Sequence, residues 1–147
     1  MKRFLLILAL MLVFFSMAKS ETVYVLCQPS SFVNVRQFPV KGAEVAGRVE
    51  LGEALETDGV KKNGYVHVCG FEGGGWINAG FVTEYPVTII NIRTQILSSG
   101  RVACRRSING TRRKWLSDGQ NVTVYAFSDD WSITDQGFIK TQYLGGF

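Results

Sequence analysis

The fold of this chain is constrained most by its short runs of alternating apolar and polar residues. Gly, Asn or Asp breaks these runs every few positions. After residue 20, no stretch of 12 residues repeats apolar side chains three and four positions apart, as an amphipathic helix requires. By contrast, residues 65–68 and 122–125 alternate as half-buried strands do. The pattern therefore predicts an all-β protein.

The predicted strands are short and closely spaced, with turn signals at Gly52, Asn63-Gly64, Asn109-Gly110 and Asp118-Gly119. They comprise residues 32–36, 44–49, 54–60, 65–69, 75–77, 102–106, 120–127, 131–134 and 137–140, and residues 87–100 are expected to hold a further strand and a connector. Strands of this length and spacing are typical of small β-barrels.

The chain also repeats itself. Residues 75–82 align with residues 137–144, aromatic on aromatic and aliphatic on aliphatic, and Gly52 upstream matches Gly119. The second copy is shorter, mostly because it lacks the glycine-rich segment 71–74. An internal repeat of this kind predicts two copies of one module, with their boundary near Pro86.

Two glycines begin the matching segments, Gly75 and Gly137, and each is followed by an aromatic residue, Trp76 or Phe138. We expect each glycine to permit a tight approach of two backbones, because it has no Cβ atom. The aromatic residues would supply apolar area to a small core.

Residues 1–20 form a predicted signal peptide. Lys2 and Arg3 precede the apolar run 4–15, and small residues then make cleavage possible after Ala18 or after Ser20. The run of 12 apolar residues is shorter than the roughly 20 that span a bilayer, so no stable membrane anchor is expected after cleavage. The protein would act in the periplasm, the cell wall or the medium, according to the host.

The sequence resembles the bacterial SH3-like (SH3b) domain family. Residues 32–36 are similar to its leucine-asparagine-valine-arginine signature, and Pro39, Leu51-Gly52 and the segment 75–82 follow in the family's order. Residues 102–106 stand in for the signature in a degraded second copy. The resemblance implies two small SH3-like β-barrels in tandem, module 1 (residues 21–86) and module 2 (residues 87–147), and recognition of peptidoglycan or short peptides.

Catalytic and metal-binding motifs are scarce. His67 and Cys69 would share one face of a strand about 7 Å apart, too far for a base to contact a nucleophile. One histidine and one nearby cysteine also fall short of a zinc site. We therefore predict a protein that is not an enzyme and that holds no cofactor and no metal.

The chain contains three cysteines. In an oxidising compartment Cys27 and Cys69, both in module 1, would form a disulfide and leave Cys104 free. The alternative is that none is bridged and each acts as a small buried apolar residue. The sequence leaves these alternatives open.

The two modules differ in the sign of their net charge. Residues 21–86 carry a net charge of −3 and residues 87–147 a net charge of +4. The basic side chains of module 2 gather around the turn at Asn109-Gly110, in a hairpin with Trp115 at its base: Arg101, Arg105, Arg106, Arg112, Arg113 and Lys114. Such a patch suits an anionic wall polymer or peptide carboxylates. It could instead be a solvated loop that docks on the acidic module.

The sequence thus predicts a secreted, non-enzymatic module that binds a cell-wall polymer, a peptide or another envelope ligand. The alternative is an adaptor or inhibitor that binds an envelope protein; nucleic acid is not an expected partner, because the protein is exported. The candidate ligand-binding residues are Tyr65, Trp76, Trp131, Arg106, Arg112, Arg113 and Lys114.

Overall fold

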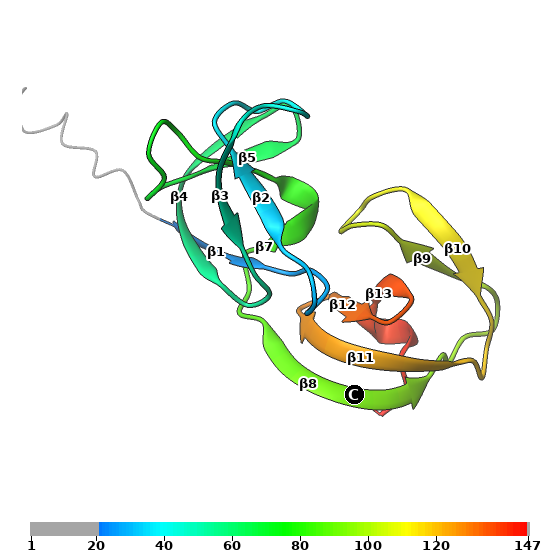
Figure 1. The fold of residues 1–147 in the computed structure, drawn as a ribbon. Coiled ribbons are helices and arrows are strands. Elements are labelled where there is room, and N and C mark those ends of the chain that lie inside the picture. Colours follow the sequence, from blue (N-terminus) through cyan, green and yellow to red (C-terminus); the bar gives the residue numbers. More distant parts are fainter. Residues whose placement is uncertain (1–20, 147) are drawn as a thin grey trace, which may run out of the picture.

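The computed structural model describes residues 21–146, so the predicted signal peptide lies outside the described residues. The described chain is all-β, as the sequence predicts: its strands form two sheets, joined by the segment around Pro86 (Figure 1). Its helical content is two short 3-10 turns, η1 (Ala79–Phe81) and η2 (Thr141–Tyr143). Within residues 21–146, no helix is long and apolar enough to cross a membrane.

The first sheet has the strand order β3-β2-β6-β5-β4-β1-β7. Its strands are β1 (Glu21–Val25), β2 (Val33–Arg36), β3 (Val45–Val49), β4 (Ala54–Lys62), β5 (Tyr65–Val68), β6 (Trp76–Asn78) and β7 (Val82–Thr83). Every pairing is antiparallel.

The second sheet has the order β10-β9-β13-β12-β11-β8 and is also antiparallel. It comprises β8 (Thr88–Gln95), β9 (Val102–Arg105), β10 (Arg112–Leu116), β11 (Asn121–Ser128), β12 (Trp131–Thr134) and β13 (Gly137–Lys140). The strands β9 and β10 form the hairpin that the basic residues predict, with Trp115 opposite Ala103.

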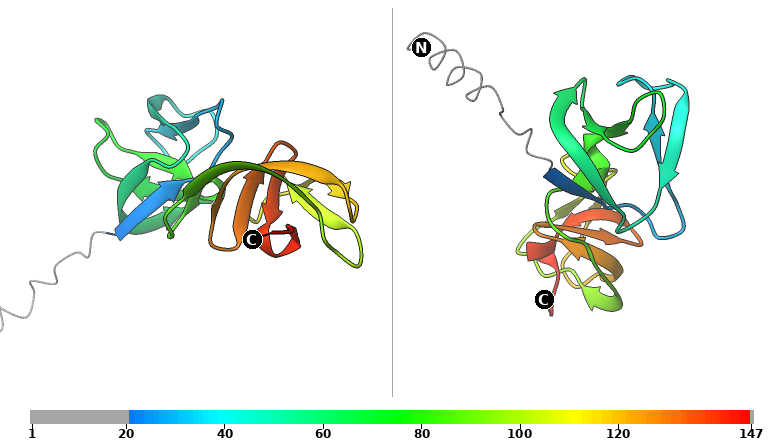
Figure 2. Two further views of the ribbon diagram at one scale, coloured as in Figure 1. Left: turned by 90° about the horizontal axis from the view of Figure 1, so that it is seen from below. Right: turned by 90° about the vertical axis from the view of Figure 1, so that its left-hand side faces the viewer.

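The sheets form because alternate side chains can be buried on one face. In β2 the buried and partly exposed residues alternate, and in β11 the alternation continues through all eight positions. Each sheet curls over its own apolar cluster (Figure 2), centred on Val35, Val68 and Ile77 in the first and on Cys104, Val124 and Ile139 in the second.

Equivalent residues of the two halves make equivalent hydrogen bonds. The Leu26 amide donates to the Phe81 carbonyl, and the Leu97 amide donates to the Tyr143 carbonyl, each over 2.9 Å. In both halves, a short strand leads directly into a 3-10 turn: β6 leads into η1, and β13 leads into η2. The residue after that turn then bonds to the first strand or its end, Val82 to Val25 and Leu144 to Ile96.

The expected barrels are not closed by hydrogen bonds. In the first sheet β3 and β7 remain edges, and in the second β10 and β8 do, among the residues described. In the first half, η1 separates β6 from β7, and these two strands do not pair with each other. In the second half, η2 follows β13, and Leu144 after it pairs with Ile96 in an isolated bridge.

The two sheets are joined by a third apolar cluster. It contains Leu26 from the first half and Trp131, Ile133 and Phe138 from the second, with Phe81 and Leu51 packed against them. Hydrogen bonds flank the cluster: the Gln28 side chain donates to the Thr134 carbonyl over 2.8 Å, and the Ile108 amide donates to the Gly80 carbonyl over 2.8 Å. The two halves are therefore packed together, not merely tethered.

The predicted role of Gly75 and Gly137 is confirmed. A Cβ atom on Gly75 would lie 2.6 Å from the Val68 carbonyl oxygen, and one on Gly137 would lie 2.8 Å from the Arg105 carbonyl oxygen. Both distances are shorter than any ordinary contact, so only glycine allows these strands to approach as they do.

Candidate functional site

A cleft of about 810 Å³ lies where the two halves meet. One wall comes from β2, the loop before it and the loop after it, and the other comes from the β9–β10 hairpin. Figure 1 shows the tip of that hairpin, in yellow, directed back toward η1. The bond between Ile108 and Gly80 holds the tip there.

The charged lining of this cleft is entirely basic. Among residues 21–146, five cationic side chains line it and no Asp or Glu does: Arg36, Lys41, Arg105, Arg106 and Arg113. The one ion pair between described residues, His67 with Asp58, lies elsewhere, so no carboxylate neutralises these cations. A concave surface lined with one sign of charge concentrates ions of the opposite sign.

Two of these arginines occupy equivalent places in the repeat. Arg36 ends β2 and lies opposite Trp76, and Arg105 ends β9 and lies opposite Phe138. Each guanidinium donates to a carbonyl of its own following loop, Arg36 to Ala43 over 2.7 Å and Arg105 to Gly110 over 2.9 Å. These bonds hold each side chain in place and leave its other N–H groups free for a ligand.

Aromatic residues flank the cations. Tyr65 is half-buried in the lining, and Phe81 and Phe138 close the inner end, with their ring centroids 6.0 Å apart. Phe32 is 45% exposed at the rim, where the Arg48 guanidinium lies 4.3 Å from its ring centroid. The cleft therefore offers apolar contact beside its positive charge, as ligand sites usually do.

The structure brings three of the predicted ligand-binding residues together in this cleft: Tyr65, Arg106 and Arg113. The others lie elsewhere. Trp131 is 9% exposed and belongs to the cluster between the halves, so it is a core residue and not part of a groove. The ring of Trp76 packs against His67, with centroids 4.9 Å apart.

Two more predicted residues, Arg112 and Lys114, lie on β10 outside the cleft lining. The Arg112 guanidinium lies 4.5 Å from the ring centroid of Trp115, and Arg101 contacts the same ring over 5.0 Å. The Lys114 ammonium donates to the side-chain oxygen of Gln136. The basic patch is thus partly cleft and partly hairpin surface.

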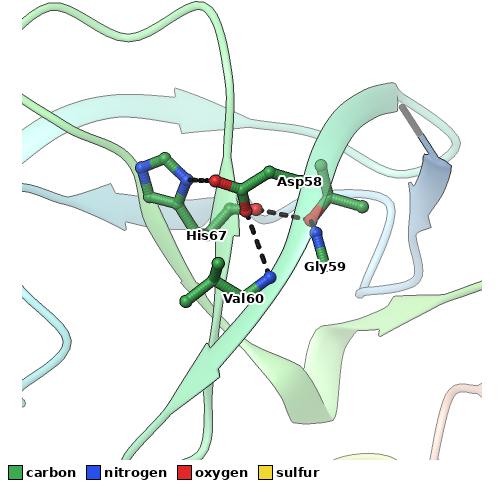
Figure 3. A network of polar contacts seen from close by, with 5 residues as sticks. Asp58, Gly59, Val60 and His67 are labelled. Carbon is green, nitrogen blue, oxygen red and sulfur yellow. Dashed lines mark hydrogen bonds and ion pairs between the residues drawn. The ribbon is translucent and has the colours of Figure 1, made fainter. Parts of the chain in front are cut away.

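His67 belongs to a polar network that the sequence did not indicate (Figure 3). Its Nδ1 atom lies 2.8 Å from the Asp58 carboxylate, and Asp58 also accepts a hydrogen bond from the Val60 amide over 3.1 Å. The Val60 bond, and then the His67 contact, lower the pKa of Asp58 despite slight desolvation. Because Asp58 and Trp76 hold the ring, His67 serves as a structural contact of the β4–β5 hairpin.

Of the two alternatives left open for the cysteines, the structure does not contain the disulfide between Cys27 and Cys69: all three cysteines are free thiols. Cys27 is 4% exposed in the core of the first half, whereas Cys69 lies exposed after β5, with its amide bonded to the Glu56 carbonyl. Burial, reinforced by Glu50 and Glu53, raises the pKa of Cys27 to about 11. Burial also raises the pKa of Cys104, whose thiol donates to the Gln136 carbonyl.

Sequence reasoning missed the part of the cleft that comes from the first half. Arg36 is the arginine of the β2 signature, and Lys41 follows in the next loop, but both were interpreted only as parts of a fold pattern. The available signal was the repeat itself, because the match of residues 32–36 with residues 102–106 aligns Arg36 with Arg106, another residue of the lining. Which face of each module meets the other cannot be deduced from that alignment.

Comparison with known proteins gives no family for this chain. No protein-family model and no curated protein matches it. Solved structures of NlpC1 and NlpC2 from Trichomonas vaginalis are similar over 90% of this chain, with TM-scores of 0.37 and 0.38 and identities of 17% and 16%. The aligned region covers 48% and 50% of those proteins, so this chain spans about half their length.

Proposed function

We propose that this protein is exported and acts outside the cytoplasm as a non-enzymatic binding protein built from two SH3-like modules. Its ligand is a cell-wall polymer, a wall peptide or another anionic component of the cell envelope. The observation that carries the proposal is the cleft between the halves, whose lining holds five cations and, among residues 21–146, no carboxylate.

Two features favour anion binding over a structural role for this charge. Arg106 and Lys41 are exposed side chains at the cleft, and no carboxylate among residues 21–146 pairs with either. The walls are also fixed by the hydrogen bonds and apolar cluster between the halves, and hydrogen bonds hold Arg36 and Arg105 in position before a ligand arrives. Preorganised arginines bind carboxylates and phosphates in bidentate fashion at little entropic cost.

A binding role suits the chemistry of the cleft better than catalysis does. The lining contains no histidine among the described residues, and its one cysteine, Cys27, has a pKa of about 11. A thiol with so high a pKa is a poor nucleophile at neutral pH, because the thiolate is the reactive form. Within residues 21–146, no group of three or more His, Cys, Asp or Glu residues could hold a metal.

Sedimentation with purified sacculi tests the proposal. We expect the wild-type protein to be retained at about 0.05 M salt and released at about 0.5 M salt, because added ions screen exposed charges. The R106A/R113A variant should lose retention, because both arginines line the cleft. The matched control is R93A/K61A, which removes the same charge from exposed positions outside the cleft.

Absence of retention at low salt would overturn the proposal, as would equal retention of R106A/R113A and the control. Amidation of the wall carboxylates before the assay identifies the anionic group. If the carboxylates are the ligand, amidated sacculi should retain less protein. If a phosphate polymer is the ligand, amidation should leave the retention unchanged.

The adaptor role has an observation of its own. Strand β8 is an edge of the second sheet, and it exposes Ile89 (63%) and Ile92 (40%). A partner that docks on this strand would be lost from the I89D variant and kept by R106A/R113A. Cross-linking to envelope extracts with these two variants therefore separates the two functions.

A further inference from the structure

We infer that an acidic polypeptide segment adds as a strand to the free edge of β10, with one end of the segment in the basic cleft. The inference rests on the proposed function for the cleft end and extends it to the kind of molecule that is bound. The inferred ligand has a backbone that donates and accepts hydrogen bonds, and it carries a row of carboxylates.

Strand β10 is free to accept another strand. Among the described residues it pairs with β9 alone and forms one end of the second sheet. Figure 1 shows it at the outer margin of the molecule. Its Arg112, Arg113, Lys114 and Trp115 side chains are exposed. An extended peptide binds such an edge through main-chain hydrogen bonds, and its side chains then determine specificity.

The charge of this edge is costly to the fold. Arg112 lies directly opposite Arg105 on β9, and like charges in directly opposite positions destabilise a strand pair. No described carboxylate forms an ion pair with either residue. An acidic strand on the other side of β10 would place carboxylates beside Arg112 and Lys114 and remove this repulsion.

The cations of β10 point to both faces of the sheet. Arg113 and Lys114 both contact Gln136, and Arg113 also lines the cleft. Arg112 instead contacts Trp115, because the register shifts between Arg112 and Lys114. A strand presents successive side chains to opposite faces, so consecutive acidic residues would meet cations on both sides of β10.

Charge distinguishes β10 from the other three edges. Strand β7 has two residues, and β3 is flanked by Glu44 and Glu50. Strand β8 is interrupted by Asn91, which has a φ of 56° and disturbs a regular ladder. An acidic segment is therefore complementary to β10 alone among the sheet edges of the described chain.

Isothermal titration calorimetry with the full-length exported protein tests the inference. The probe is a decapeptide with four consecutive glutamates, compared with the same peptide carrying N-methyl groups on alternate backbone nitrogens. N-methylation keeps the charge and removes the donors needed for strand pairing. We expect it to weaken binding about tenfold or more, as the loss of several main-chain hydrogen bonds predicts.

Three variants locate the site. R112A/K114A should weaken binding of the decapeptide about tenfold while changing binding of inorganic phosphate to the cleft less than twofold. R106A should weaken both, and R93A/K61A neither. Because the N-methyl comparison uses the wild-type protein, it decides the question even if a variant fails to fold.

Equal affinity for the N-methylated and unmodified peptides would overturn the inference. So would polyphosphate of the same charge binding as tightly as the decapeptide, because that polymer has no backbone to pair. Sacculus retention is a separate measurement. If sacculi do not retain the protein but the peptide still binds, the proposal of a wall ligand would be overturned. The same result would support strand addition by a segment of an envelope protein.

Discussion

The rings of Phe81 and Phe138 meet edge to face across the boundary between the two halves, with centroids 6.0 Å apart. Phe81 lies in η1, between β6 and β7 of the first half, and Phe138 lies in β13 of the second. Phe138 is 2% exposed and belongs to the apolar cluster that joins the halves. This contact makes the position of one module depend on the packing of the other.

Replacing Phe138 with alanine should lower the free energy of unfolding by about 3–5 kcal/mol, the usual cost of removing a buried aromatic ring. Urea denaturation followed by tryptophan fluorescence measures the loss. The control is Phe38→Ala, because Phe38 is 62% exposed, and its effect should stay within about 0.5 kcal/mol. Equal effects of the two substitutions would contradict the assignment of Phe138 to a shared core.

Substituting alanine for Gly137 should also destabilise the fold, by about 1–3 kcal/mol, because the new Cβ would overlap backbone atoms. The Cβ would lie 2.8 Å from both the Arg105 carbonyl oxygen and the Cys104 sulfur, and the φ of +133° disfavours any side chain. Gly100→Ala is the control, since nothing lies within 4 Å of its Cβ position. Differential scanning calorimetry should show a lower Tm for G137A and an unchanged one for G100A.

The Asp58–His67 contact predicts a pH effect on stability. Because the folded protein lowers the pKa of Asp58 below 3.8, the stabilisation is present above that value and is lost as the pH falls through the lower, folded pKa. Asp58→Asn should therefore reduce stability near about pH 6, and its effect should become smaller as the pH falls below about 3.8. Urea unfolding across this pH range measures the change, and an effect that does not depend on pH would refute it.

Thiol labelling should distinguish the three cysteines. Cys69 is exposed and should react with iodoacetamide in the native protein, whereas Cys27 and Cys104 are buried with raised pKa values and should react only after unfolding. Mass spectrometry of native and denatured samples counts the labels. One label before unfolding and three after it are expected; an unreactive Cys69 would show that the thiol is oxidised or covered.

The local pattern of the chain predicted most of its elements. Strands β12 and β13 begin and end at the predicted residues, β2 and β5 differ from their predictions by one residue at one end, and β11 differs by one residue at each end. In β2, β5 and β11 burial on one face produces the alternating pattern, whereas β12 is buried at all four positions and β13 at three. Strand β10 was expected only as an arm of a hairpin, since Arg112, Arg113 and Lys114 leave it without an alternating pattern.

The site was harder to predict than the fold, because it depends on how the two halves pack. Tyr65, Arg106 and Arg113 were identified from residue type and charge, and the structure brings them together. Trp131 has the same residue type as a typical ligand-binding aromatic, but docking of the halves buries it. Arg36 and Lys41 become site residues only when the second half closes the other wall.

The hydrogen bonds from Gln28 to Thr134 and from Ile108 to Gly80 join the two halves, so separating the halves would break these bonds and expose the apolar cluster beside them. A chain cut at Pro86 would leave Leu26 and Phe81 on one fragment and Trp131 and Phe138 on the other, all facing water. Each fragment would then carry an exposed apolar patch that favours aggregation. Soluble fragments for deletion mapping would therefore need these residues replaced by polar ones, whereas the two unsubstituted fragments should reassemble when mixed.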